Sequence, residues 1–305
     1  MSSGVTVAVV GATGAVGETT LKLLEQRRFP VKSLHAYASE RSVGKTVTFS
    51  GESMPVEKLG PSSFKGIEMA FFSAGAAQAK EFAPIAAAAG AAVIDKSSAF
   101  RMDPKVPLVV PEINAHALRG HEGIISCPNC TTIITVMPLK PLHEAGRLRR
   151  VVATSYQAVS GAGVKRIEEL RVQTQAWARG EKIEPKYFVD QIAFNLIPHT
   201  DPFGPDGYTG EEKKLINEVR KILELPNLAI SPTTVRVPVF TAHSIAINAE
   251  TELPISPARE VFRQFAGLQV WDTPEQNRYP CRSQSKARTT ASWAASARIC
   301  RIPVR

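Results

Sequence analysis

The sequence predicts an α/β protein: a doubly wound parallel sheet in the first part of the chain, followed by an α+β domain. Three observations lead to this prediction. Residues 5–10, VTVAVV, form an apolar and β-branched run that is typical of a strand buried on both faces. A glycine-rich turn and a helical pattern follow it, and strands alternate with helices to about residue 127. Beyond residue 130 the helices are longer and the strands alternate, which favours an antiparallel or mixed sheet.

The remaining elements of the first part follow from short apolar runs and the stretches between them. Further strands are predicted at 33–38, 69–73 and 92–95, with a helix at 18–27 and an alanine-rich helix at 79–89.

In the second part, an apolar stripe at helical spacing predicts amphipathic helices at 164–179 and 210–225. Strands are predicted at 150–159, 233–240 and 244–252, and a last helix at 257–265 is capped by Ser256.

Length and composition indicate an ordinary globular protein. The chain has 305 residues, 44% hydrophobic and 21% charged, which is enough for two domains. The longest apolar runs, such as 82–94, are too short and too rich in alanine and glycine to span a bilayer, so no membrane partner is expected. Because the N-terminus lacks the basic region of a signal peptide and four cysteines make no disulfide framework, we expect a cytoplasmic protein.

The net charge of +9 comes from the end of the chain. Seven Lys or Arg residues and no acidic residue lie from Arg278 onward, while the 30 basic residues before it nearly balance 28 acidic ones. No folded domain therefore carries a basic face, and we expect no nucleic-acid partner.

The glycine-rich turn between the first strand and the first helix predicts dinucleotide binding. Glycines at this turn allow a pyrophosphate to approach the backbone, and the helix N-terminus supplies N–H donors. The spacing is GxxGxxG, which is a weak motif by itself, and a purely structural turn is the alternative. The candidate cofactor residues of this turn are Gly11, Thr13, Gly14, Ala15, Val16 and Gly17.

The residues after the second predicted strand favour NADP over NAD. Arg41 and Ser42 suit the 2′-phosphate of NADP, whereas Glu40 keeps open a ribose contact of the NAD type.

Cys130 is the candidate nucleophile. Asn129 is a good N-cap for the apolar run that follows, which places Cys130 in the first helical turn, where the helix dipole favours a thiolate. A buried structural cysteine is the alternative. Cys127 completes a Cys-x-x-Cys pair, but no second pair or histidine cluster supports a zinc site or a redox dithiol.

Taken together, the motifs resemble the aspartate-β-semialdehyde dehydrogenase family from about Val5 to Pro280. The motifs are the glycine turn, SSAFR at 97–101, VPE at 110–112, PNC at 128–130, SYQAVSG at 155–161, EEKK at 211–214 and RVPV at 236–239 leading to His243. The resemblance implies NADPH-dependent reductive dephosphorylation of L-aspartyl-4-phosphate to L-aspartate-4-semialdehyde, on the route to lysine, methionine and threonine. It also implies a homodimer or homotetramer.

The resemblance further implies roles for the matching residues. Cys130 would form a thioester, His243 would act as acid and base with a near-neutral pKa, and Gln157 would hold the carbonyl or orient the substrate. Taken alone, His243 and Gln157 are more often structural contacts.

Charged residues would bind the ends of the substrate. Arg236 would hold the α-carboxylate, Glu211 the α-ammonium group, and Arg101 with Lys214 the phosphoryl group. A surface salt bridge is the alternative for Glu211 and Lys214. By resemblance Ser160 and Gly161 contact the cofactor, with a flexible turn as the alternative.

The expected domains are an NADP-binding Rossmann-like domain at 1–127, a catalytic and dimerisation α+β domain at 128–280, and an atypical basic tail at 281–305. The tail lacks alternation, a helical stripe and acidic residues, so we expect it to be disordered and to lower stability or cofactor affinity. A milder departure is Lys96, where the family usually has asparagine.

Two other functions remain open at this point. N-acetyl-glutamyl-phosphate reductase shares the acyl-phosphate chemistry, although Glu211, Lys214 and Arg236 suit a free amino acid better. A catalytically impaired homologue that binds nucleotide or a partner subunit is favoured only by the altered C-terminus.

Overall fold

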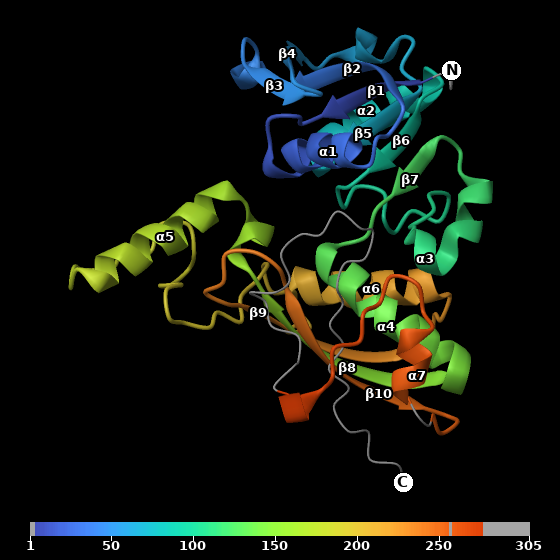
Figure 1. The fold of residues 1–305 in the computed structure, drawn as a ribbon, viewed down its shortest axis with the longest axis vertical. Coiled ribbons are helices and arrows are strands. Elements are labelled where there is room, and N and C mark those ends of the chain that lie inside the picture. The colour runs from blue at the N-terminus through green and yellow to red at the C-terminus, as the bar shows by residue number, and fades with distance from the viewer. Residues whose placement is uncertain (1–3, 256–257, 277–305) are drawn as a thin grey trace. The chain divides into compact units, whose positions relative to one another are not determined.

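The computed structural model describes residues 4–255 and 258–276, which form two compact units (Figure 1). The first unit ends at Asn129 and the second begins at Cys130. The predicted tail, residues 281–305, lies outside the described residues, as does Ser256, the expected cap of the last helix.

The first unit is built on a seven-stranded sheet in the order β3-β4-β2-β1-β5-β6-β7. All neighbouring strands are parallel except the β3–β4 pair. The strands are β1 Val5–Val10, β2 Val31–Ala38, β3 Thr46–Phe49, β4 Glu52–Lys58, β5 Met69–Phe72, β6 Ala92–Asp95 and β7 Ile124–Ser126. The helices are α1 Ala15–Gln26, α2 Ala76–Ala88 and α3 Pro111–Asn114, with 3-10 turns η1 Glu40–Ser42, η2 Pro61–Phe64 and η3 Ala115–Gly120.

Strand β1 is buried on both faces, as its apolar run predicts. Val9 belongs to the cluster that contains Leu21 of α1, while Val10 belongs to the cluster that contains Phe82 of α2. Since successive side chains of a strand point to opposite faces, α1 and α2 cover opposite sides of the sheet. This arrangement confirms the doubly wound, Rossmann-like fold.

Two features of this unit differ from the sequence prediction. Helix α1 begins at Ala15 rather than Glu18, because the extended Gly14 serves as its N-cap. The β3–β4 hairpin was not predicted. Its turn residues Ser50 and Gly51 both have positive φ, 51° and 81°, and such turns match the twist of paired antiparallel strands.

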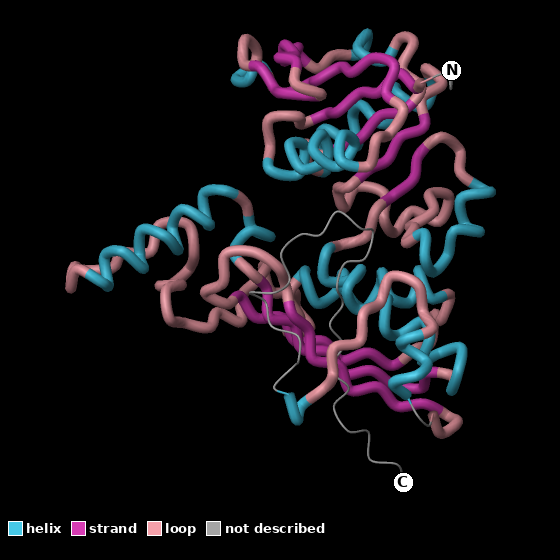
Figure 2. The backbone as a smooth tube through the Cα atoms, in the orientation of Figure 1, coloured by secondary structure: helices cyan, strands magenta, loops and turns pink. Residues whose placement is uncertain are grey.

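The second unit contains a three-stranded mixed sheet in the order β10-β8-β9 (Figure 2). Strand β8 is parallel to β9 and antiparallel to β10. The strands are β8 Leu148–Gln157, β9 Ala229–Arg236 and β10 Ser244–Thr251. The helices are α4 Cys130–Gly146, α5 Val164–Ala178, α6 Gly210–Leu223 and α7 Ala258–Arg263, with 3-10 turns η4 Val159–Ala162 and η5 Pro274–Gln276.

Strand β9 ends at Arg236, so the predicted strand at 233–240 was placed too far along the chain. Pro238 has no N–H to donate to a ladder, and Val239 instead donates to the carbonyl of Val237 in a tight turn. This turn leads the chain back to β10. Among the described residues, no helix is long and apolar enough to cross a membrane.

Candidate active site

Three of the predicted site residues lie together at one end of the strands of the three-stranded sheet. Gln157 and Arg236 end the parallel strands β8 and β9 and are partners in register. His243 directly precedes β10, whose first residue pairs with Tyr156 of β8. Because β10 runs antiparallel to β8, its beginning meets the carboxyl ends of the other two strands. The mixed sheet thus gathers residues far apart in sequence.

Gln157 connects the first turns of α4 and α6. Its Nε2 donates to Thr131 Oγ1 at 3.0 Å and to Glu211 Oε1 at 3.3 Å. Gln157 is 1% exposed, and buried hydrogen bonds from a side-chain amide hold that side chain in one orientation. Cys130, the residue before Thr131, is the first residue of α4, as predicted.

The Cys130 thiol is less acidic than its helical position suggests. The residue as a whole is exposed, but loss of hydration around the thiol raises its pKa, and the charge of Glu211 raises it further. Hydrogen bonds with Thr131 and the charge of Arg236 oppose this shift and are outweighed. Burial and Glu211 thus act against the thiolate, opposite to the effect expected of the helix terminus.

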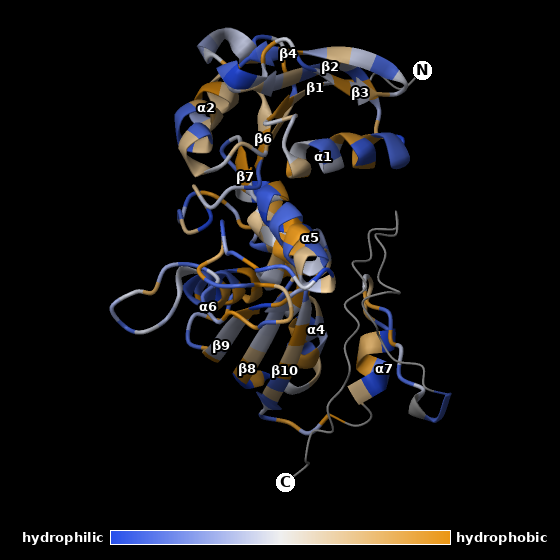
Figure 3. Ribbon diagram, turned by 90° about the vertical axis from the view of Figure 1, so that its left-hand side faces the viewer, coloured by the Kyte–Doolittle hydropathy of each residue, from blue (hydrophilic) through white to orange (hydrophobic). Residues whose placement is uncertain are grey.

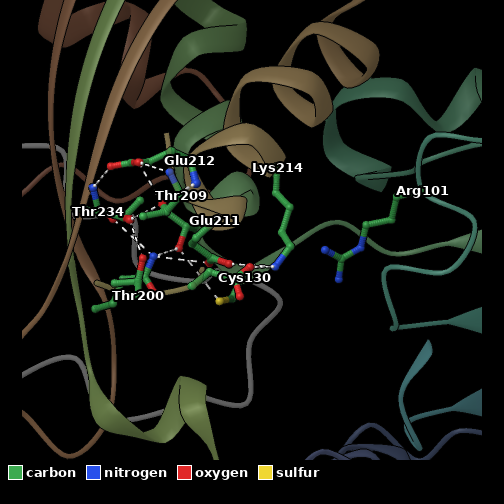
Figure 4. A network of polar contacts seen from close by, with 12 residues as sticks. Arg101, Cys130, Thr200, Thr209, Glu211, Glu212, Lys214 and Thr234 are labelled. Atoms are coloured by element: carbon green, nitrogen blue, oxygen red, sulfur yellow. Dashed lines mark hydrogen bonds and ion pairs between the residues drawn. The ribbon is translucent and has the colours of Figure 1, made fainter. Parts of the chain in front are cut away.

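Glu211 and Lys214 form a partly buried pair. Lys214 Nζ lies 3.2 Å from Glu211 Oε2 and 2.9 Å from Asp201 Oδ2 (Figure 4). Burial acts to lower the pKa of Lys214, but the two carboxylates outweigh it, and the pKa is raised. Because Glu211 is only 9% exposed, the pair is not a solvated surface salt bridge.

Arg236 is buried, and its guanidinium points to one backbone partner. Its Nη1 donates to Ala158 O at 2.8 Å. Among the described residues this is the one hydrogen bond of the guanidinium group, which leaves its other donors for a ligand. Burial lowers the pKa of Arg236, and the charges of Glu211 and Cys130 oppose this shift without cancelling it. The buried positive charge is therefore only partly neutralised by its neighbours and favours binding of a carboxylate.

His243 differs from the near-neutral acid–base group that was expected. Its Nδ1 accepts the N–H of Ala158 at 2.9 Å. Burial and the charge of Arg236 lower its pKa to about 4, against the opposing charge of Glu211. The imidazole is therefore neutral at pH 7.

Ser160 and Gly161 lie in the turn η4, between β8 and α5. Ser160 N donates to Phe240 O at 3.1 Å and Gly161 N donates to Ala158 O at 3.3 Å. The turn is therefore bonded to the segment that joins Arg236 to His243, and a merely flexible turn does not describe it.

The glycine-rich turn of the first unit has the geometry that a dinucleotide requires. Gly11 has φ of +84°, and a Cβ there would lie 2.8 Å from the backbone of Ser73. A Cβ at Gly17 would lie 2.2 Å from Gly11 O. Larger residues are thus excluded where β1, β5 and α1 converge, and no side chain in the described part of the chain caps the first N–H groups of α1. Ala15 and Val16 form the first turn of this helix.

The residues after β2 lie against this turn. Thr13 Oγ1 donates to Ser42 Oγ at 3.3 Å, and Arg41 is exposed beside it in η1. Glu40 forms an ion pair with Lys58 at 2.9 Å.

Arg101 belongs to the first unit and is held by backbone carbonyls. Its Nε donates to Cys127 O at 2.9 Å and its Nη2 to Lys96 O at 3.1 Å. Lys96 itself donates to Thr20 Oγ1 at 2.6 Å, and burial lowers its pKa. Cys127 is a free thiol whose pKa is raised by burial. Among residues 4–255 and 258–276, no group of three His, Cys, Asp or Glu residues could hold a metal ion.

Several structural partners of the site were not found from the sequence. Asp201 and the Ala158 peptide carry no local signal. The capping box of α6 does have one, because Thr209 and Glu212 follow the Thr-x-x-Glu pattern before an apolar run. Glu212 accepts the N–H of Thr209 at 2.7 Å and that of Thr234 at 3.0 Å, which ties α6 to β9 beside Arg236.

Comparison with known proteins places both units in one family. Residues 6–121 match the family model described as semialdehyde dehydrogenase, NAD binding domain. Residues 139–301 match the semialdehyde dehydrogenase, dimerisation domain, so the match runs past Pro280, where the resemblance was expected to end.

Individual relatives agree with these family models. The chain is 52% identical over 283 residues to an aspartate-semialdehyde dehydrogenase of Aquifex aeolicus, covering 91% of this chain and 83% of the relative. It is 44% identical to that of Bacillus subtilis, covering 92% and 84%. The structure of aspartate semialdehyde dehydrogenase II from Vibrio cholerae superposes with a TM-score of 0.87 at 43% identity, covering 91% of this chain and 83% of that one. The chain therefore belongs to the aspartate-semialdehyde dehydrogenase family.

Proposed function

We propose that the protein reduces L-aspartyl-4-phosphate to L-aspartate-4-semialdehyde and phosphate, with NADPH as the hydride source. The observation that carries this proposal is the cluster at this end of the strands. Cys130, Gln157, Glu211, Arg236 and His243 come from five separate segments and lie together in one unit. A Vibrio cholerae relative of 42% identity has been solved in complex with ASA, which agrees with a substrate of this class.

The nucleophile in this proposal is Cys130. Its thiolate attacks the acyl carbon, a C–S bond forms, the bond from that carbon to the phosphate oxygen breaks, and phosphate leaves. The thioester retains an electrophilic carbon, so a difficult displacement becomes two easier steps. When bound, NADPH supplies the hydride that reduces this carbon. The C–S bond breaks as the aldehyde is released, and the sulfur returns as a thiolate.

The charged residues would select a free amino acid. The guanidinium of Arg236 is suited to a two-point contact with the α-carboxylate, and Glu211 carries the opposite charge needed for the α-ammonium group. Lys214, with its raised pKa, is a permanent cation for the phosphoryl group, together with Arg101. An N-acetylated substrate has no ammonium group to compensate Glu211, which argues against N-acetyl-glutamyl-phosphate reductase.

The cofactor would be held by the glycine-rich turn of the first unit, with Ser160 and Gly161 as further contacts. The close backbone approach at Gly11 and Gly17 supports binding of a pyrophosphate. Arg41 and Ser42 support NADP, while the carboxylate of Glu40 forms an exposed ion pair with Lys58.

We also propose that the protein forms a homodimer through its second unit, which matches a dimerisation domain. Helix α5 and the segment after it carry exposed apolar side chains: Val172, Trp177, Val189, Phe194 and Leu196. Figure 3 shows apolar and polar residues along this helix. The rings of Trp177 and Phe194 lie 4.6 Å apart, and exposed aromatic pairs of this kind are typical of interfaces. The homotetramer and the cytoplasmic location stay predictions.

One assay tests the enzymatic proposal. Phosphate-dependent reduction of NADP by aspartate semialdehyde should be abolished in Cys130→Ala and retained in Cys127→Ala, which removes the neighbouring thiol. Activity only with the N-acetylated glutamate analogue would instead identify the reductase. NADP binding without turnover of either aldehyde would identify the impaired homologue.

A further inference from the structure

The peptide group of Ala158 contacts both His243 and Arg236. Its N–H donates to His243 Nδ1 at 2.9 Å, and its carbonyl accepts from Arg236 Nη1 at 2.8 Å. Ala158 is 0% exposed, and its bond to Arg236 is fully buried. A single buried backbone unit therefore orients the imidazole and the guanidinium together.

The turn that carries this peptide is itself fixed. Val159 N donates to Val239 O at 2.9 Å and Ser160 N donates to Phe240 O at 3.1 Å. These bonds join η4 to the segment between Arg236 and His243. They hold the Ala158 peptide against the part of the chain that carries both of its side-chain partners.

Gly161 is needed here for space rather than for backbone conformation. Its φ is not in the left-handed region, so alanine could adopt the same backbone. A Cβ at Gly161 would nevertheless lie 3.0 Å from both Cε1 and Nε2 of His243 and 3.3 Å from Nη1 of Arg236. With alanine at this position, the imidazole would have to shift by a few tenths of an ångström, which would strain its bond to Ala158.

The hydrogen bond to Ala158 also determines the tautomer of His243. A neutral imidazole carries one proton, and the nitrogen that accepts an N–H cannot hold it. The proton is therefore on Nε2. A general base acting at Nε2 would have to place that proton on Nδ1, directly against the N–H of Ala158.

We propose that residues 158–161 form a positioning element in which Gly161 is the essential residue, and that this element holds His243 as an Nε2–H donor. The role in the reaction rests on the proposed function: Nε2–H would donate to the carbonyl oxygen of the acyl group while negative charge develops there. Gly161 acts through His243 and Arg236 and is distinct from the groups that react.

The charges around the imidazole are compatible with this state. Burial disfavours a second proton on His243, and the positive charge of Arg236 adds to this effect. The negative charge of Glu211 favours that proton. The balance keeps the ring neutral at pH 7, where it can donate through Nε2.

The experiment is a titration of ¹⁵N-labelled histidines by NMR, in protein free of substrate and cofactor. The His243 signals are identified by their loss in His243→Ala. We expect Nδ1 unprotonated and Nε2 protonated, with a pKa of about 4. In Gly161→Ala, the imidazole must shift away from Ala158, so this bond should weaken and both tautomers should appear. Gly120→Ala, where nothing lies within 4 Å of an added Cβ, should leave the His243 signals unchanged.

Kinetic measurements on the same variants complete the test. Gly161→Ala should lower kcat roughly tenfold or more. A proton on Nδ1 in the unchanged protein would overturn the proposal, even if Gly161→Ala failed to fold. Unchanged His243 signals in a folded Gly161→Ala that binds NADP more weakly would also overturn it, since Gly161 would then be a cofactor contact only. Because the NMR arm needs no turnover, an inactive enzyme with the expected tautomer would contradict the proposed function alone.

Discussion

Cys130 lies in surroundings that oppose its ionisation until substrate arrives. Two causes raise the pKa of its thiol, burial and the carboxylate of Glu211. If Glu211 binds the α-ammonium group, as proposed, the substrate itself compensates the second cause. The thiol would then ionise more readily in the complex than in the free enzyme.

Replacement of Glu211 by glutamine tests this coupling. Without the carboxylate charge the pKa of Cys130 falls, so iodoacetamide should alkylate the free variant faster at pH 8, by roughly threefold to tenfold, because one pKa unit changes the thiolate fraction tenfold. Glu184→Gln is the matched surface control. Equal alkylation rates for the two variants would show that Glu211 has no influence on the thiol.

The low pKa of His243 predicts how stability depends on pH. The folded-state pKa, about 4, lies below the ordinary value of 6.5, so the unfolded chain binds this proton first as the pH falls. The contribution of neutral His243 to the free energy of unfolding is complete above pH 6.5. It is lost as the pH falls toward 4, by up to about 3 kcal/mol. Urea unfolding at pH 7 and pH 4.5 should therefore show a larger loss for the unchanged protein than for His243→Asn. Parallel losses would contradict this assignment.

The first turn of α6 is the element that brings the acidic and basic groups together. Its capping box is buried: Thr209 is 0% exposed and Glu212 is 8% exposed. Glu212 accepts N–H bonds from Thr209 and from Thr234 of β9, so the helix start is fixed beside Arg236. Figure 4 shows this network next to Glu211 and Lys214. The capping residues thus position Glu211 and Lys214, which are proposed to bind the substrate, as well as capping the start of the helix.

Loss of the Glu212 carboxylate should destabilise the second unit. Glu212→Ala leaves two buried backbone N–H groups without an acceptor, each costing about 1–3 kcal/mol, so we expect a loss of roughly 2–6 kcal/mol of unfolding free energy. Chemical denaturation measures it, with the exposed Glu184→Ala as control. A loss as small as that of the control would mean that water replaces the carboxylate.

At the scale of the whole molecule, helix α5 and the segment at 186–196 are joined by hydrogen bonds to buried side chains and carry an apolar surface. Glu169 accepts N–H bonds from Lys186 and Tyr187, and Gln173 accepts them from Ile192 and Ala193. These buried side chains hold the segment against the helix. The exposed Trp177 and Phe194 are presented on an ordered scaffold, as a dimer interface requires.

A charge at this surface should dissociate the dimer. Trp177→Asp places a carboxylate where we expect an apolar contact, and burial of an unpaired charge is costly, so the dimer dissociation constant should rise about 100-fold or more. Size-exclusion chromatography with light scattering measures the mass. Val43→Asp, at an exposed apolar residue of the first unit, should stay dimeric. A Trp177→Asp dimer of unchanged affinity would place the interface elsewhere.

Local sequence patterns determined most of what could be predicted. The apolar run of β1, the glycine turn and the start of α4 at Cys130 depend on residues close together in the chain, and the structure has them as predicted. The end of β9 and the β3–β4 hairpin were missed, because a single proline and a two-residue turn with positive φ decided them.

Only the tertiary structure decided the chemical state of the site. The sequence by itself determined the fold class, the family and the identity of Cys130, Gln157, Arg236 and His243 as candidates. It did not determine that the Cys130 pKa is raised or that His243 is neutral, because both depend on burial and on charges from other strands and helices. Nor did it determine that Ala158 and Gly161 orient His243, since a peptide group and a missing side chain acquire that role only when distant segments meet.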